Sequence, residues 1–432
     1  MKPAISFYSI ILLFTLVLSL NAQEIQQLAD MPERVSNQAV TVVSVDGKDY
    51  VYSFSGIDDT KLYTGIHKRA FKYDVQANSW EIIAPLPTGN GRIAASASTV
   101  KGKIYVIGGY EVFEDESEIS VDLVHVYDPK TDQYLTDATP IPVPIDDHVQ
   151  AVWRDSLIYV VTGWSNTTNV PDVQIYNPSN NVWQAGTPVP ANNTYEVFGS
   201  SGSIIGDTIY YAGGAKISGG AFGFSNVLRR GVINPNDPTD ITWSHQTSFS
   251  AVGYRMGAAV WQEKRPIWIG GSKDAYNYDG IGYSSGLGIE PYERILELKT
   301  DNNQLDVTPI TLPIMDIREV AQLDRNTIIV CGGMSNGQDV SAAAYRVDLS
   351  LVNTLDQSNN NMVELFPNPT KSRLFLDTKP QVFYTIFNGL GQQVKAGYYL
   401  ESGIKVEELV PGNYQLVIET DKVFITKNFV KQ

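Results

Sequence analysis

Short apolar runs separated by turns recur along residues 24–349. Each run is rich in Ile, Val and Tyr and ends in a glycine or a glycine pair, as in IYVIGG, IYVVTG and IIVCGG. Runs of this length and composition, bounded by glycine, predict β-strands and not helices. The glycines that end the runs are spaced 51 to 62 residues apart, at Gly56, Gly109, Gly163, Gly214, Gly271 and Gly333. The pattern therefore predicts six repeated, all-β units.

The residues after each glycine follow the same order from unit to unit. A strand centred on an aromatic residue such as Tyr73 comes next, and a second large aromatic residue such as Trp80 follows it. Units four and five depart from this order, because Ile233 and Leu296 take the place of the tyrosine. Large aromatic rings at fixed places supply apolar area that packs one unit against the next.

This set of repeats resembles the kelch repeat, whose period is close to 50 residues. The resemblance covers residues 24–349 and implies a six-bladed kelch β-propeller, in which four-stranded sheets surround a central axis. A pair of β-sandwiches is the alternative, although sandwiches have no such period. Backbones converge where the second strand of a blade ends, and glycine fits there because it lacks a Cβ and adopts positive φ.

The N-terminal end of the repeat region contains a strand that the last repeat lacks. Residues 25–34, IQQLADMPER, resemble residues 81–87, EIIAPLP, which form the outer strand of unit one and its turn. Unit six has no outer strand of its own, because the repeat pattern stops after Leu349. We therefore expect the N-terminal segment to form the outermost strand of the sixth blade, which leaves only short, protected sheet edges.

The first residues of the chain have the pattern of a secretory signal peptide. Residues 1–22 begin with Met1-Lys2, continue with an apolar stretch and end at Asn21-Ala22, where a signal peptidase can cut. An uncleaved membrane anchor is the alternative. No later segment is apolar for long enough to span a bilayer, so we expect no transmembrane segment in the mature chain. We expect residues 23–349 of the mature chain to form the propeller.

A second unit follows the repeats. Residues 350–362 form a polar linker that contains QSNNN, and residues 363–432 alternate apolar positions with glycine turns, which predicts a small C-terminal β-sandwich. The segments LFPNPT, YTIFNGLGQQV and LVPGNYQLVI in this tail resemble the type A C-terminal sorting domain of secreted Bacteroidota proteins. The resemblance implies the type IX secretion machinery as a partner, and a protein that is secreted or held on the outer cell surface. An additional binding sandwich is the alternative.

A formal net charge of −15 limits the kinds of molecule that the protein can bind. Nucleic acid is excluded, because binding phosphates requires a basic face that releases counterions. Cys331 is the only cysteine, which excludes an intramolecular disulfide and a cysteine-clustered metal site. The four histidines have no second histidine at ligand spacing, so we expect no bound metal and no cofactor.

Candidate binding residues gather where the inner strand of each unit begins. In a propeller this turn lies on the same face as the loop between strands two and three, and the longest such loops are residues 110–124, 215–231 and 272–294. Loops on a rigid scaffold commonly carry binding sites. The polar side chains expected around this mouth of the channel are Asn37, Arg92, His148, Glu196, Arg255 and Arg318.

Two interpretations of these side chains stay open. Arginine forms forked hydrogen bonds to carboxylates, so the candidate ligand-binding residues are Arg92, His148, Glu196, Arg255 and Arg318. The same side chains can instead tie the blades together. No motif indicates a catalytic residue. Glu196 is a weak candidate by analogy with the sialic acid mutarotases, kelch propellers in which acid–base groups open a sugar ring.

The sequence thus favours a secreted, non-catalytic propeller that binds a protein or a glycan, with a mutarotase-like carbohydrate enzyme as the alternative. Other motif matches carry less weight. GYSSG at residues 282–286 matches the serine hydrolase string, but it lies in a glycine-rich loop where no strand–turn–helix elbow is expected. The acidic run of residues 111–122 is interpreted as a solvated loop, with calcium binding as the alternative.

Overall fold

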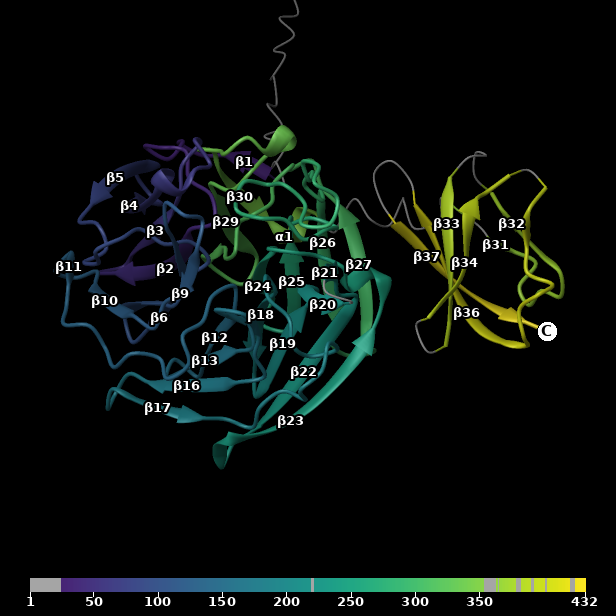
Figure 1. Ribbon diagram of the computed structural model, residues 1–432, viewed down its shortest axis with the longest axis horizontal. Coiled ribbons are helices and arrows are strands. Elements are labelled where there is room, and N and C mark those ends of the chain that lie inside the picture. The colour runs from purple at the N-terminus through teal and green to yellow at the C-terminus, as the bar shows by residue number, and fades with distance from the viewer. Residues whose placement is uncertain are drawn as a thin grey trace, which may run out of the picture.

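The computed structural model of the protein contains two all-β units (Figure 1). It describes residues 25–218, 221–352, 363, 365–377, 382–389, 392–400, 402–419 and 424–432. The expected signal peptide and residues 353–362 of the expected linker lie outside the described residues. The first residues assigned to the linker are instead helical, because α1 spans Leu349–Val352.

Residues 25–348 form six four-stranded antiparallel sheets, the blades of the propeller. The first three blades contain β2 (Ala39–Val45), β3 (Lys48–Ile57), β4 (Ile66–Asp74) and β5 (Ser79–Ile83); β6 (Ser96–Val100), β7 (Lys103–Ile107), β10 (Val124–Asp128) and β11 (Gln133–Tyr134); and β12 (Val149–Trp153), β13 (Leu157–Val161), β16 (Val173–Asn177) and β17 (Val182–Ala185).

The other three blades contain β18 (Ser201–Ile205), β19 (Thr208–Ala212), β22 (Val227–Asn234) and β23 (Asp237–Thr247); β24 (Gly257–Trp261), β25 (Arg265–Ile269), β26 (Arg294–Lys299) and β27 (Gln304–Pro309); and β28 (Ala321–Gln322), β29 (Thr327–Cys331), β30 (Ala344–Asp348) and β1 (Ile25–Gln27). The loops between strands two and three add short hairpins, β8 (Tyr110–Val112) with β9 (Glu118–Ser120), β14 (Trp164–Ser165) with β15 (Thr168–Asn169), and β20 (Ala215–Ser218) with β21 (Ala221–Phe224).

The N-terminal strand closes the ring as expected. β1 pairs with β30, with Ile25 opposite Val347 and Gln27 opposite Tyr345. The indole of Trp80 in blade one donates a 2.9 Å hydrogen bond to the carbonyl of Ala29, just beyond this strand. The first and last repeats are therefore held together by main-chain pairing and by a side chain from the neighbouring blade.

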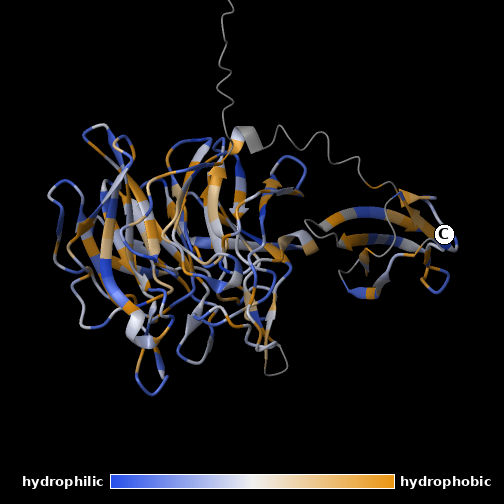
Figure 2. Ribbon diagram, turned by 90° about the horizontal axis from the view of Figure 1, so that it is seen from above, coloured by the Kyte–Doolittle hydropathy of each residue, from blue (hydrophilic) through white to orange (hydrophobic). Residues whose placement is uncertain are grey.

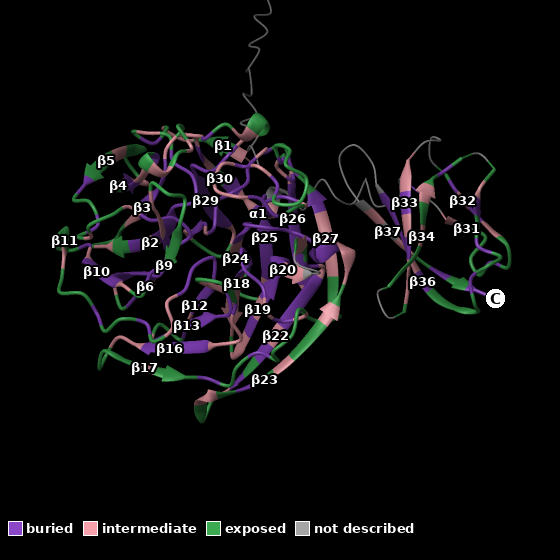
Figure 3. Cartoon of the chain, viewed as in Figure 1, coloured by how far each residue is buried: buried purple, intermediate pink, exposed green. Residues whose placement is uncertain are grey.

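The hydrophobic core is divided among the gaps between blades. Each gap has its own cluster of buried residues, and every cluster draws side chains from two adjacent sheets. Strands with both faces in such gaps read as continuous apolar runs, and all five residues of β13 are buried. The outermost strands β5, β17 and β23 are largely exposed (Figure 3). Hydrophobic residues accordingly concentrate on the strands and hydrophilic residues on the loops (Figure 2).

The repeated residues have clear packing roles. Tyr73 and Trp80 pack with ring centroids 5.0 Å apart, and Tyr176 and Trp183 repeat this distance in blade three. Gly109 has φ +91°, and a Cβ there would lie 2.7 Å from the carbonyl oxygen of Ile93. The glycine signature therefore marks the place where a second strand ends against the start of its own blade's inner strand.

The C-terminal unit is a β-sandwich. One sheet contains β31 (Leu365–Phe366), β32 (Arg373–Leu376) and β35 (Ile404–Lys405). The other contains β33 (Phe383–Asn388), β34 (Gln393–Tyr398), β36 (Gly412–Glu419) and β37 (Phe424–Lys431). Leu374 from the first sheet and Ile386 and Leu416 from the second lie in one buried cluster, so the two sheets share a core.

Candidate functional site

Six equivalent residues surround the propeller axis just before the inner strands. In each blade the preceding residue forms a β-bridge with the residue that directly follows the repeated glycine. The equivalent residues, called the axial ring here, all have left-handed backbones: Asn37 (φ 56°), Ala94 (56°), Asp147 (47°), Gly199 (64°), Arg255 (48°) and Asp316 (60°). Hydrogen bonds between main-chain groups connect consecutive members at N–O distances of 3.1, 3.4, 3.1, 2.8 and 2.7 Å. The ring is thus a rigid backbone collar.

Charged side chains of this ring and of the nearby Arg318 form one network of ion pairs. Arg255 donates to both carboxylate oxygens of Asp147, at 3.1 and 2.7 Å, and to Asp316 at 2.9 Å. Arg318 pairs with Asp147 at 3.0 Å. The four side chains come from blades three, five and six and are fully buried. Their charges balance, so the network, called the axial plug here, neutralises itself without a ligand.

The plug fixes the protonation of its carboxylates. Burial raises the pKa of Asp147, but Arg255 and Arg318 outweigh it and hold that pKa below its usual value. Burial raises the pKa of Asp316, because it outweighs the opposing effects of Arg255 and of the hydroxyl of Ser36, which donates to Asp316. The two arginines therefore stabilise the ionised form of Asp147 more strongly than that of Asp316.

A loop of blade five covers the plug on the side of the long loops, called the loop face here. Tyr276 in this loop is fully buried, and the Arg255 guanidinium lies 5.6 Å from its ring centroid. Tyr278 packs against a buried cluster that contains Ile57 of blade one and Ile93 of blade two. The channel is therefore closed on the loop face, first by side chains and then by the loop.

The candidate residues from the sequence separate into two groups. Arg255 belongs to the axial ring, and His148 and Arg318 follow ring residues by one and two positions. Arg92 instead lies between blades one and two, where it donates to the carbonyl of Val106 at 3.3 Å and where burial lowers its pKa to about 10. Its position two residues before the ring is equivalent to that of buried apolar residues in other blades.

Glu196 also lies away from the ring. It is half-buried, and burial together with the charge of Asp172 raises its pKa. Among the described residues it forms no ion pair with Arg92 or Arg255. The structure therefore brings together Arg255, Arg318 and the main chain of His148, but neither Glu196 nor Arg92.

The sequence did not predict Asp147 and Asp316 as residues of the site. A signal for them exists, because both occupy the ring position when each unit is aligned on its left-handed residue. The ring position holds six residues of five types, and this variety hides it from a search for repeated residues.

The opposite end of the channel, called the axial pocket here, is a cavity of about 330 Å³ lined by the inner strands of all six blades. Its walls carry hydroxyl and amide groups from Thr41, Ser98 and Gln150. Glu319 accepts hydrogen bonds from the main-chain N–H groups of Val40 at 3.0 Å and Ala97 at 2.9 Å, and burial raises its pKa to about 7.

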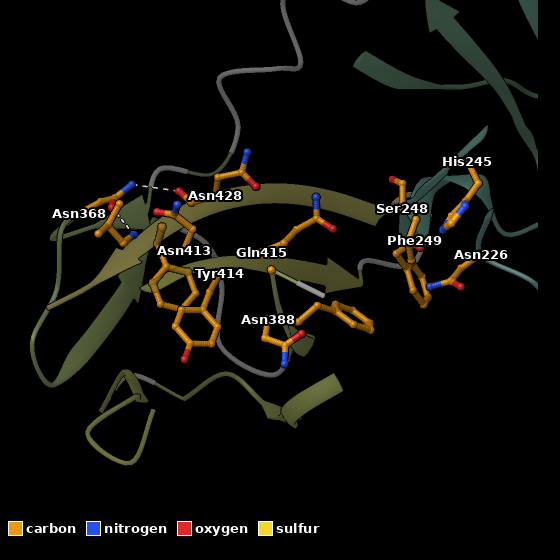
Figure 4. Close-up of a pocket in the computed structure, with 15 residues that line it drawn as sticks. Asn226, His245, Ser248, Phe249, Asn368, Asn388, Asn413, Tyr414, Gln415 and Asn428 are labelled. Atoms are coloured by element: carbon orange, nitrogen blue, oxygen red, sulfur yellow. Dashed lines mark hydrogen bonds between the residues drawn. The ribbon is translucent and has the colours of Figure 1, made fainter. Parts of the chain in front are cut away.

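A larger cleft of about 740 Å³ lies between blade four and the C-terminal unit. His245 and Phe249 line it on the propeller side, and Asn388, Asn413 and Gln415 line it on the other (Figure 4). Phe249 and Phe387 approach with ring centroids 5.8 Å apart. One wall belongs to the C-terminal unit, so this cleft exists only while both units are joined.

Neither a metal cluster nor a membrane helix is found in the described part of the chain. Within the described ranges, no three His, Cys, Asp or Glu side chains gather closely enough to hold a metal ion. None of the helices described there has the length and apolar character needed to cross a membrane.

Two family models match the chain. One, the KLHDC2/KLHL20/DRC7 Kelch-repeats domain, matches residues 9–215, and the other, the Secretion system C-terminal sorting domain, matches residues 364–432. The chain is a kelch-repeat propeller with a secretion sorting domain. The sorting domain indicates that this kelch protein engages the type IX secretion machinery and is secreted or displayed on the outer surface.

Curated relatives of the kelch protein align over part of their length. Kelch-like protein 35 of Mus musculus is 27% identical over 150 residues, which cover 35% of this chain and 23% of that protein. Kelch-like protein terF of Aspergillus terreus is 27% identical over 194 residues, covering 44% and 40%. Beta-scruin of Limulus polyphemus is 28% identical over 174 residues, covering 39% and 18%. The chain spans less than half the length of these relatives.

A solved structure confirms the fold. "Structure of YjhT" matches with a TM-score of 0.58 and 16% sequence identity, over 73% of this chain and 95% of that one. At this identity the likeness concerns the fold alone.

Proposed function

We propose that this kelch protein is an extracellular recognition module that binds a partner protein through its loop face. The observation that carries the proposal is the position of its exposed apolar side chains. In the described propeller, five of the nine large exposed apolar residues lie on loops between strands two and three: Leu62, Ile119, Phe224, Tyr283 and Leu287. Apolar side chains gathered on one face, with polar neighbours, are typical of protein interaction sites.

The acidic residues of the loop face also support this face as the binding surface and indicate the kind of partner. The loop of blade two carries Glu111, Glu114, Asp115, Glu116 and Glu118 with no lysine or arginine between residues 110 and 124. Ile119, 52% exposed, lies within this acidic segment. Complementary charge steers association and selects partners. The expected partner is therefore a protein that presents an apolar patch surrounded by basic residues.

The geometry of the plug counts against catalysis at the mouth of the channel. A mutarotase-like site needs a carboxylate beside an arginine that is free to hold a substrate anion. Arg255 already makes three hydrogen bonds to Asp147 and Asp316, and Glu196 lies elsewhere. The sequence-based interpretation that these polar residues tie blades together is the one that this geometry favours.

A glycan on the same face is the second candidate. Trp164, Phe222 and Tyr283 come from blades three, four and five and pack at centroid distances of 5.5 and 4.8 Å. Tyr283 is 38% exposed. Partly exposed aromatic rings beside polar loops also suit the apolar faces of sugars.

The test compares two matched triple variants. Leu62, Ile119 and Leu287 on the loops are changed to serine. As the control, Ile82 and Val182 on the outer strands and Leu135, directly after β11, are changed likewise. Serine leaves the net charge unchanged. Partners are enriched by quantitative affinity purification on the wild type, and the affinity of the purified partner is then measured for all three proteins.

The proposal expects the loop variant to bind at least about tenfold more weakly, since interface anchors each contribute more than about 1 kcal/mol. The outer-strand variant keeps the wild-type affinity, and binding weakens with salt. Equal loss in both variants, or loss in the control alone, would place the binding surface elsewhere. Binding of glycans on an array that depends on Tyr283, with no protein partner, would favour the second candidate.

A further inference from the structure

The axial pocket has a closed end and an open end. The axial plug and the loop of blade five close it towards the loop face, and the inner strands form its walls. A volume of about 330 Å³ is at the lower end of the range for small-molecule sites. The pocket is therefore separated from the proposed protein-binding face by the width of the plug.

Most polar groups in the pocket walls already have partners. Thr41 and Thr99 pair at 3.0 Å, and Gln150 donates to Ser98 at 2.8 Å. Nη1 of Arg318 lies in the ion pair with Asp147. Three other buried atoms of residues that line the pocket have no hydrogen-bond partner among the described residues: Nδ1 of His148, Oγ of Ser203 and Nε of Arg318. Buried polar atoms are normally hydrogen-bonded to protein or to ordered water, so these three are the positions at which an occupant of the pocket can bond.

The hydrogen-bonding role of His148 follows from its neighbours. The amide nitrogen of Gln150 donates to Ser98, so its oxygen faces Nε2 of His148, at 3.1 Å. That oxygen can only accept, and Nε2 therefore carries the proton. Burial lowers the pKa of His148 to about 3, so the ring is neutral and Nδ1 is an acceptor. The occupant must donate a hydrogen bond to it.

The charges of the pocket disfavour an ion. Arg318 is paired with Asp147, and Glu319 accepts main-chain hydrogen bonds from two other blades. Arg318 and Glu319 are the charged residues that line the pocket, and the charge of Arg318 is offset by Asp147, so the walls present no net positive charge to an anion. The groups that need partners are one acceptor, one donor and one hydroxyl, which matches the hydroxyl groups of an uncharged molecule.

The separation of these groups sets the size of the occupant. His148 follows the axial ring by one residue and Ser203 by four. At about 3.3 Å per residue along a strand, the two levels differ by about 10 Å. One or two sugar rings span this distance.

We propose that the axial pocket binds an uncharged polyhydroxy molecule of one or two sugar rings, whose hydroxyl groups bond to His148, Ser203 and Arg318. The site does not depend on the loop-face partner, because the plug lies between them. Ser203→Ala removes the hydroxyl without adding atoms to the pocket. Thr168→Val also removes a single hydroxyl, in the exposed part of β15 outside the pocket.

The test uses isothermal titration of the purified protein with D-glucose, maltose and, as an acidic sugar, N-acetylneuraminate, together with a crystal structure at high maltose concentration. We expect a neutral sugar to bind, with density beside His148, and Ser203→Ala to weaken it by about three- to tenfold, the range for one hydrogen bond. Thr168→Val leaves binding unchanged. A pocket that holds only water in the maltose crystals, or tighter binding of N-acetylneuraminate than of both neutral sugars, overturns the proposal.

Discussion

Asp147 shows how one residue organises the centre of the propeller. Its two oxygens receive Arg255 from blade five and Arg318 from blade six, although Asp147 itself belongs to blade three. A charge in such a place is stable only while its partners remain, because an unpaired buried ion loses its hydration without compensation.

Replacing Asp147 by asparagine should therefore be strongly destabilising. The variant keeps the shape of the side chain but leaves two buried guanidinium groups with one carboxylate, Asp316. Breaking a buried pair in this way costs about 3–5 kcal/mol. Urea unfolding measures the change, with the exposed Asp59→Asn as control. A loss below about 1 kcal/mol would show that the plug does not stabilise the ring.

Buried histidines predict loss of stability in acid. Burial is the main cause that lowers the pKa of His67 and His148 to about 3, and both remain neutral in the folded protein. The unfolded chain takes up these protons near pH 6.5, so the stabilising effect is complete above that pH and is lost as the pH falls towards 3. At pH 4.5 each histidine costs at most about 3 kcal/mol.

The measurement is the free energy of unfolding between pH 7.5 and 4.5, in the wild type and in His67→Gln. The variant is expected to lose less stability over this range than the wild type. Parallel curves would mean that His67 does not contribute to the acid sensitivity.

Glycines at two places in blade two offer a direct test of the repeat. Gly109→Ala places a Cβ 2.7 Å from the carbonyl oxygen of Ile93 and 2.9 Å from the Cβ of Ala95. Gly102 also has positive φ but nothing within 4 Å, so Gly102→Ala carries only the backbone cost, about 1 kcal/mol. Thermal unfolding should show a clearly larger loss for Gly109→Ala. Equal losses would contradict the close approach.

At the level of elements, closure depends on three residues of β1. This strand covers the edge of β30, and Leu28 and Met31 extend the contact with main-chain hydrogen bonds of 2.8 and 2.7 Å to Ala344 and Ala342. An uncovered edge strand is a template for pairing with other chains.

Removing residues 1–31 should lower the thermal unfolding temperature and promote association, whereas removing residues 1–22 should do neither. Differential scanning calorimetry and light scattering report the two effects. Equal behaviour of the two truncated proteins would show that β1 is not needed for closure.

The strands of the blades could be predicted from the sequence where the same packing or backbone requirement recurs in each repeat. Glycine is required where strands converge, and Tyr73–Trp80 packing recurs, so these residues revealed the blades and the closing strand. The hairpins of the loop face were missed as strands, because their two to four residues carry no periodic pattern. α1 was missed for the same reason.

For the whole molecule, the two ends of the axis differ. The loop face is closed and carries exposed apolar and acidic side chains, while the other end opens into the axial pocket. The sequence indicated the face with the long loops but placed Arg92 and Glu196 at its mouth. Arg92 contacts a carbonyl between blades because it lies two residues before the ring position and not at it. No repeated residue marks the ring position, so the sequence did not reveal this difference. The ion pairs of Arg255 join residues that are more than 60 positions apart and lie in separate repeats, so only the folded structure reveals them.

Hydrogen–deuterium exchange of the protein with and without its purified partner tests the central claim most directly. The account predicts added protection in residues 110–120 and 272–293 of the loop face, and none in β5 or β17. Protection confined to those outer strands, with the loops unchanged, would contradict it.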